Sequence, residues 1–76
     1  MKITLKLFAQ YRENLFKIKE LELEKGTKAV DVMDMYGIAN HKLPLGVLMI
    51  NSRHADEQTE LQDGDILSLF PKVGGG

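Results

Sequence analysis

The sequence has no cysteine among its 76 residues. Without a thiol, the chain cannot form a disulfide, a thiolate nucleophile, a cysteine metal site or a side-chain persulfide. Long apolar runs are also missing: none approaches the roughly 18 residues of a membrane-spanning helix, and the first residues lack the pattern of a signal peptide. We therefore expect a cytoplasmic protein with no membrane partner, whose covalent chemistry uses a group other than a cysteine side chain.

An excess of basic charge is absent as well. The formal net charge is −1, whereas electrostatic binding of nucleic acid needs a clustered basic face, so we expect no nucleic-acid partner. The acidic residues are unevenly distributed, and one stretch over residues 56–65 has no lysine or arginine between them: Asp56, Glu57, Glu60, Asp63 and Asp65. We predict a solvated loop face here; the alternative is a docking surface for a basic partner.

The composition that remains is that of one small soluble domain, with 43% hydrophobic and 28% charged residues. The chain closes on Gly74, Gly75 and Gly76. Because glycine has no Cβ, such a tail can enter a slot too narrow for other residues, although glycine-rich termini without a function are also common. We expect a folded domain over residues 1–70 and a flexible tail over residues 71–76.

Alternating apolar residues predict strands in the first third of the chain. Residues 2–9 form one strand with Ile3, Leu5, Leu7 and Ala9 pointing inward, which leaves Phe8 on the polar face to cover a second surface or to meet a partner. Residues 10–17 break the alternation and predict a loop or a helical turn. A second strand follows at about 18–24, and Ile18 is out of phase with its leucines, so we expect it before the strand pairing or at a bulge.

A short helix is predicted over residues 28–36, with Thr27 as its N-cap and Gly37 as the left-handed residue that ends it. Its apolar stripe consists of Ala29, Val30, Val32, Met33 and Tyr36, while Lys28, Asp31 and Asp34 face water. A helix this short must pack on a sheet to persist.

The second half of the chain predicts three more strands. A crossover loop over 38–46 leads to the continuous apolar run 47–50, which is typical of a central strand covered on both faces. Asn51-Ser52 predicts a turn into a short edge strand near 53–55. Leu61 is expected in the core, and Asp63-Gly64-Asp65 predicts a turn into a final strand over 66–70.

The resulting order, β-β-α-β-β-β, predicts an α+β fold of the β-grasp (ubiquitin-like) class. We expect a mixed sheet of four to five strands with one main helix packed on it, and the first and last strands adjacent and parallel in the middle. Fold alone does not determine function, because one fold serves many functions.

Several segments also carry a family resemblance: residues 2–13 (KITLKLFAQYRE), Gly26-Thr27, residues 48–51 (LMIN) and above all residues 61–76 (LQDGDILSLFPKVGGG). With them the chain resembles the MoaD/ThiS family of ubiquitin-like sulfur carriers over nearly its whole length. Phe8-Ala9, Arg12-Glu13 and Phe70-Pro71 resemble the small subunit of molybdopterin synthase more than the thiazole carrier. Asn51-Ser52 departs from an expected Asn-Gly, and the triple glycine also fits the thiazole branch.

The resemblance implies a chemistry for the tail. An adenylating, ubiquitin-activating-like enzyme would use ATP to activate the carboxylate of Gly76, and a sulfur donor would convert it into a thiocarboxylate. Gly75 would give clearance in the enzyme channels. The segment that would contact partners, among them the larger catalytic subunit of molybdopterin synthase or a thiazole synthase, consists of Phe70, Pro71, Lys72, Val73 and Gly74. Phe70 also fits the core or the sheet surface, and Pro71 also fits the end of a strand.

Two alternatives use the same tail: a thiazole-pathway carrier, and a ubiquitin-like modifier that forms isopeptide bonds to lysines through Gly76. A third is a binding module with an inert tail. His41 and His54 lack the neighbours that a metal site or general base requires. No glycine-rich phosphate loop is present, so we expect no cofactor bound by the chain itself and no enzymatic activity of its own.

Overall fold

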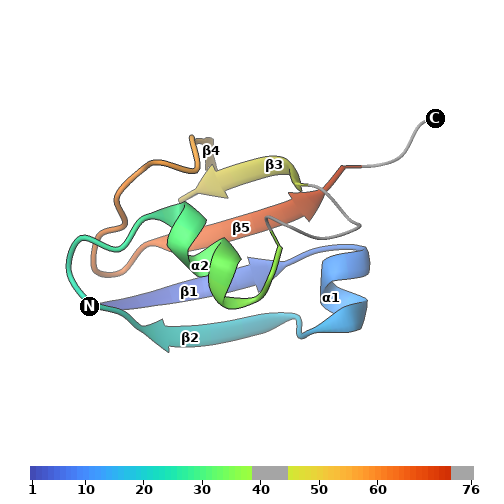
Figure 1. Cartoon of the computed structure of the whole chain (residues 1–76), viewed down its shortest axis with the longest axis horizontal. Helices are drawn as coiled ribbons and strands as arrows, with labels where there is room; N and C mark the ends of the chain where they lie inside the picture. Colours follow the sequence, from blue (N-terminus) through green and yellow to red (C-terminus); the bar gives the residue numbers. More distant parts are fainter. Residues whose placement is uncertain (39–44, 73–76) are drawn as a thin grey trace.

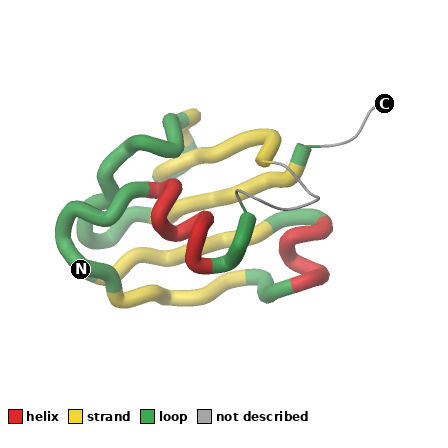
Figure 2. Tube along the Cα trace, in the orientation of Figure 1, coloured by secondary structure: helices red, strands yellow, loops and turns green. Residues whose placement is uncertain are grey.

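The computed structural model describes residues 1–38 and 45–72. They form a mixed five-stranded sheet in the order β2-β1-β5-β3-β4, and α2 crosses one of its faces (Figures 1 and 2). The elements are β1 (Lys2–Leu7), α1 (Gln10–Asn14), β2 (Ile18–Glu22), α2 (Ala29–Met35), β3 (Leu45–Ile50), β4 (Arg53–His54) and β5 (Ile66–Pro71). The β-grasp prediction is confirmed.

The first and last strands lie side by side and parallel in the middle of the sheet, as the sequence predicted. Thr4 to Leu7 of β1 pair in register with Ile66 to Leu69 of β5, while every other strand pair is antiparallel. Parallel pairing brings the carboxyl ends of β1 and β5 to the same end of the molecule. There α1 follows β1, and the chain leaves β5 (Figure 1).

The core lies between the sheet and α2. Ile3, Leu5 and Leu7 of β1 and Leu67 and Leu69 of β5 are fully buried. They meet Ala29, Val32 and Met33 of α2, together with Tyr11, Leu21, Ile38, Leu48 and Leu61. The inward alternation of β1 and the core position of Leu61 are thus confirmed. Burial raises the pKa of the Tyr11 phenol, because the charged form is poorly solvated there.

The start of α2 corrects one expectation. The cap residue is Lys28, not Thr27: the Lys28 N–H donates to the Asp31 carboxylate at 2.8 Å, and the Thr27 hydroxyl donates to the Glu24 carbonyl at 2.7 Å. A carboxylate in the first turn satisfies a free N–H and favours the helix dipole. At the other end Gly37 has φ 68°, which confirms its left-handed role.

The loop before β5 places acidic side chains in structural roles. Asp65 is buried and accepts bonds from the Gln62 N–H at 2.8 Å and from the Asn51 amide at 2.9 Å. Asn51 in turn accepts from the Ile66 N–H, and Asp63 accepts from the Lys2 N–H. The predicted turns at 51–52 and 63–65 are therefore tied together, and Asp65 does not belong to a solvated face.

Four other expectations are corrected at the strands. Ala9 lies beyond β1, is exposed and has φ 51°, so it starts α1 instead of pointing into the core. Ile18 pairs in register with Lys6, without a bulge. Leu45 and Gly46 belong to β3, not to the loop, whose residues 39–44 lie outside the described ones. Pro71 is buried and ends β5, one residue beyond the expected end of the final strand.

Candidate functional site

The face of the sheet opposite α2, called the outer face below, carries a row of apolar side chains. Phe8, which directly follows β1, lies in one row with Phe70 of β5 and Val47 of β3. The next row across the sheet consists of Ile18, Lys6, Ser68 and Met49. None of these side chains is fully buried, and Ile18 is 53% exposed. The run 47–50 is therefore covered on one face only, which corrects the prediction of burial on both.

Two phenylalanines form the centre of this face. The rings of Phe8 and Phe70 stack with centroids 4.1 Å apart and an interplanar angle of 11°. Arg12 of α1 lies over the Phe8 ring, with its guanidinium carbon 5.2 Å from the centroid, a cation–π geometry. Stacked aromatics that remain accessible are typical anchors of protein interfaces.

A shallow groove of about 410 Å³ runs beside Phe70 toward the end of β5. Its lining consists of the apolar residues Val47, Met49, Phe70 and Pro71 together with Gly46, His54 and Lys72. Lys72 is also the last residue that the structure describes before the tail. A groove of this kind accepts an apolar side chain, and its position links that contact to the tail.

Gly46 sets the geometry at this point. A Cβ on Gly46 would lie 2.7 Å from the Lys72 Cα, 2.9 Å from its nitrogen and 2.9 Å from the Pro71 carbonyl oxygen. Only glycine lets the two backbones approach this closely. The register between β3 and β5 shifts at the same place, between Leu45 and Val47. The exit of the chain from the sheet is therefore fixed by backbone contact.

The structure brings together three of the predicted partner-binding residues. Phe70, Pro71 and Lys72 all line the groove, while Val73, Gly74, Gly75 and Gly76 lie outside the described residues. His54 lies in the exposed edge strand β4 beside the groove, and His41 falls outside the described residues. Sequence reasoning missed Arg12, Val47 and Met49. The sequence did carry one indication of an apolar outer face, because Phe8 and Ile18 are apolar residues out of phase with the inward-pointing ones.

Across residues 1–38 and 45–72, no three histidine, cysteine or acidic side chains come together in a way that could hold a metal ion. In that same part of the chain, no helix is long and apolar enough to cross a membrane. The described residues present an exposed, partly apolar surface that reaches as far as Lys72.

The fold and this surface define a ubiquitin-like β-grasp protein. The sequence matches the ThiS family over residues 5–76, so the chain belongs to the ThiS family, whose members are small ubiquitin-like carrier proteins of the MoaD/ThiS type. No curated protein matches the sequence.

Solved structures agree with this fold. SAMP1 from Haloferax volcanii superposes with a TM-score of 0.79 at 21% identity, over 100% of both chains. A putative molybdopterin converting factor subunit 1 from Pyrococcus furiosus superposes with a TM-score of 0.76 at 24% identity, over 96% of this chain and 99% of that one. A chain from the complex of subunits 1 and 2 of molybdopterin-converting factor from Helicobacter pylori superposes with a TM-score of 0.67 at 20% identity, over 100% of both chains.

Proposed function

We propose that the chain is a sulfur carrier for molybdopterin biosynthesis whose reactive group is the carboxylate of Gly76. The observation that carries the proposal is the continuity between an exposed apolar surface and the root of a glycine tail, in a member of the ThiS family. A carrier of this kind must be held by its partners on one surface while its end reaches their reacting atoms. The outer face and residues 73–76 fit these two tasks.

The chemistry starts from a carboxylate, which is a poor electrophile. An oxygen of the Gly76 carboxylate attacks the α-phosphate of ATP on an activating enzyme, which releases pyrophosphate and leaves an acyl-adenylate. Sulfide from a donor then attacks the acyl carbon, AMP leaves, and the product is a thiocarboxylate. The sulfur is carried on the main chain, which is consistent with a chain that contains no cysteine.

Gly74 and Gly75 let the tail pass through narrow channels because they have no side chain. The six residues from Pro71 to Gly76 span at most about 20 Å when extended. Phe70, Pro71 and Lys72 would contact the enzyme that holds the carrier, since they line the groove at the point where the tail begins.

The proposed partners are an adenylating enzyme, a sulfur donor and the larger catalytic subunit of a molybdopterin synthase. The Helicobacter pylori neighbour was solved as a complex of subunits 1 and 2 of molybdopterin-converting factor. That complex supports the idea that a protein of this fold works beside a second subunit. The chain itself would act as cosubstrate, in the cytoplasm, without a bound cofactor.

Intact-mass analysis tests the proposal. The purified chain is incubated with an adenylating enzyme of the ubiquitin-activating type, ATP and a sulfide donor, and we expect the replacement of one oxygen by sulfur, confined to the C-terminal peptide. A chain extended by two residues beyond Gly76 is the matched control, because it has no carboxylate on Gly76. Absence of the mass change in the native chain, or its presence in the extended one, would refute the Gly76 chemistry.

The family and the neighbours also support a modifier function, since SAMP1 is described as a small archaeal modifier protein. A modifier would use the same adenylate but form isopeptide bonds to lysines. Immunoblots of cell extracts separate the two: adducts of higher mass that disappear when Gly76 is removed favour the modifier. Transfer of sulfur to a thiazole instead of a molybdopterin precursor would assign the chain to the thiazole branch.

A further inference from the structure

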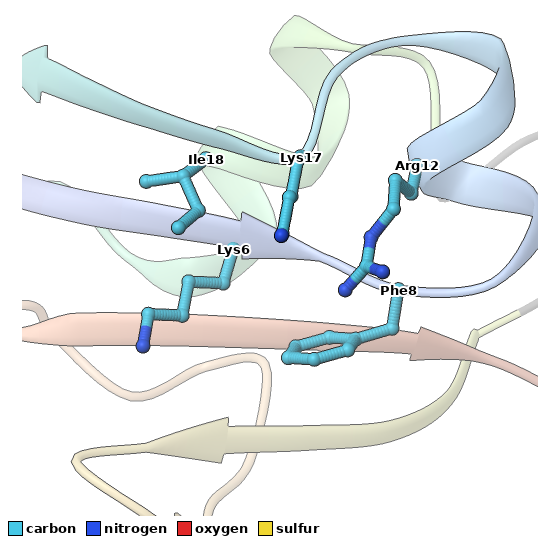
Figure 3. A pocket seen from close by; sticks show the side chains of 5 residues that line it. All are labelled: Lys6, Phe8, Arg12, Lys17 and Ile18. Carbon is cyan, nitrogen blue, oxygen red and sulfur yellow. The ribbon is translucent and has the colours of Figure 1, made fainter.

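A second pocket lies on the outer face, on the side of Phe8 away from the groove (Figure 3). It has a volume of about 130 Å³ and is lined by Lys6, Phe8, Arg12, Lys17 and Ile18. Pockets that enclose a drug-sized ligand start at about 300 Å³. This pocket therefore has room for one small group and not for a nucleotide.

The charges of the lining are all positive. Figure 3 shows the Arg12 guanidinium and the Lys17 amine pointing into the same space beside the Phe8 ring, while the stem of Lys6 borders it from β1. The Arg12 Nε–H donates to the Leu7 carbonyl at 3.2 Å, which helps to hold the guanidinium over the Phe8 ring. Within residues 1–38 and 45–72, the only ion pair joins the N-terminal amine to Glu22, so none of these three cations has a carboxylate partner there.

The outer face is also divided by charge along its length. Lys6, Arg12, Lys17 and Lys72 surround the end from which the tail leaves, whereas Glu20 and Glu22 of β2 lie toward the opposite end. A chain with net charge −1 has thus gathered basic groups around its apolar surface. A complementary partner surface carries carboxylates beside an apolar side chain.

We propose that the outer face is a two-part docking site for an acidic segment of a partner protein, in which the pocket beside Phe8 receives a carboxylate and the groove beside Phe70 receives an apolar side chain. The stacked phenylalanines separate the two parts. The inference deepens the proposed function, and rests on it only in taking this segment to belong to an enzyme that handles the carrier.

The sheet geometry sets the spacing of that segment. The pocket lies at β1 and the groove at β3, which are separated by β5 alone. Two strand spacings are about 10 Å, which is the span of about three residues in the polyproline II conformation, and its repeat of three residues per turn points side chains i and i+3 to the same side. The partner segment should therefore present its acidic and apolar side chains three positions apart.

A peptide titration tests this with the full chain. The probe is the terminally blocked tetrapeptide acetyl-Glu-Ser-Ser-Phe-amide, followed by the chemical shifts of the ¹⁵N-labelled protein. We expect saturable shifts at the amides of Lys6, Phe8, Met49 and Phe70. The acetyl-Gln-Ser-Ser-Phe-amide control should bind about three- to tenfold more weakly, as expected for the loss of a hydrogen-bonded charge. Raising the salt concentration should weaken only the acidic probe.

Protein variants locate the carboxylate. Lys17→Gln and Arg12→Gln should weaken the Glu probe about three- to tenfold and leave the Gln probe unchanged. Lys25→Gln removes the same charge from an exposed loop away from the pocket and is the matched control. Within the described residues Lys17 is bonded only through its backbone carbonyl, which accepts from the Leu7 N–H, and not through its side chain. Lys17→Gln should therefore keep the fold even if Arg12→Gln does not.

Three outcomes of the peptide titrations would overturn the proposal: no shift with the Glu probe, equal binding of the Glu and Gln probes, or an equal effect of Lys25→Gln and Lys17→Gln. Larger shifts of the same amides with inorganic phosphate would assign the pocket to a phosphate-bearing ligand and would also overturn it. Because the titration uses neither ATP nor an activating enzyme, its failure leaves the thiocarboxylate chemistry untouched, and failure of that chemistry leaves the titration interpretable.

Discussion

At the scale of single residues, Gly46 determines how closely β3 and the end of β5 approach. We expect Gly46→Ala to destabilise the fold by about 1–3 kcal/mol, because the new methyl group would meet the Lys72 and Pro71 backbone at 2.7–2.9 Å and neither neighbour is the end of a flexible side chain. Urea unfolding measures the loss, and the Lys72 amide shift reports displacement of the tail root. Gly26→Ala is the control: its Cβ would meet nothing within 4 Å and only the φ of 94° opposes it, so it can cost stability but should leave the Lys72 amide unchanged. An unmoved Lys72 amide in Gly46→Ala would contradict the prediction.

Ser52 shows the opposite case, a residue that is not glycine where glycine fits better. Asn51 and Ser52 have φ 53° and 68°, the left-handed pair of a type I′ hairpin turn. The left-handed conformation costs about 1–2 kcal/mol for residues with a Cβ, and glycine loses roughly 0.5–1 kcal/mol more entropy on folding. Ser52→Gly should therefore stabilise the fold by about 0.5–1 kcal/mol in urea unfolding. Ser52→Ala keeps the Cβ and should not raise the free energy of unfolding. An equal gain in this variant would mean that loss of the serine hydroxyl, and not relief of the left-handed backbone, stabilises the fold.

At the scale of whole elements, the sequence predicted the positions of the strands better than their surroundings. Alternation in residues 2–9 identified the inner face of β1, because period two follows from the pleat. The same pattern left Phe8 and Ile18 out of phase, and the run 47–50 suggested burial on both faces. Phe8, Ile18, Val47 and Met49 lie on the outer face, whereas Leu48 is buried in the core. Periodicity reports which side chains share a face and not whether this chain or a partner covers it, so the errors coincide with the candidate site.

The polar part of the site was beyond such reasoning. Residues 10–17 show neither the period of a strand nor that of a long helix, so no sequence pattern predicts where the side chains of Arg12 and Lys17 point. The positive φ of Ala9 turns the chain into α1 and brings Arg12 over Phe8. By contrast, Phe70, Pro71 and Lys72 follow directly from the end of a predicted strand, and in the structure all three line one groove.

The pairing of β1 with β5 brings Phe8 and Phe70 together, so the free energy of their stacking can be measured. We expect a double-mutant cycle of Phe8→Ala and Phe70→Ala to show a coupling of about 0.5–1.5 kcal/mol in urea unfolding, the value typical of aromatic pairs. Each single change should cost less than Leu69→Ala, which empties the core and should cost about 2–5 kcal/mol. Additive single changes would mean that the rings do not stack in solution.

At the scale of the whole molecule, folding and the proposed chemistry occupy different parts of the chain. The buried residues found in the described structure run from Ile3 to Pro71, and the last register pair joins Pro71 to Leu45. A chain that ends at Gly74 should therefore unfold within about 0.5 kcal/mol of the native one, as surface changes usually do. It should bind the acidic probe unchanged and yet gain no sulfur, because the carboxylate no longer reaches the reacting atoms of the activating enzyme.

A Gly75→Ala, Gly76→Ala variant separates the effect of tail length from the effect of side-chain size. It keeps the length and the terminal carboxylate but adds two methyl groups. We expect it to be adenylated far more slowly than the native chain while its stability is unchanged, because the side chains meet the walls of a channel that fits glycine. Intact-mass time courses on the three chains give the comparison. Sulfur incorporation into the chain ending at Gly74 would contradict Gly76 as the reactive end, and native rates in the double-alanine chain would show that length alone matters.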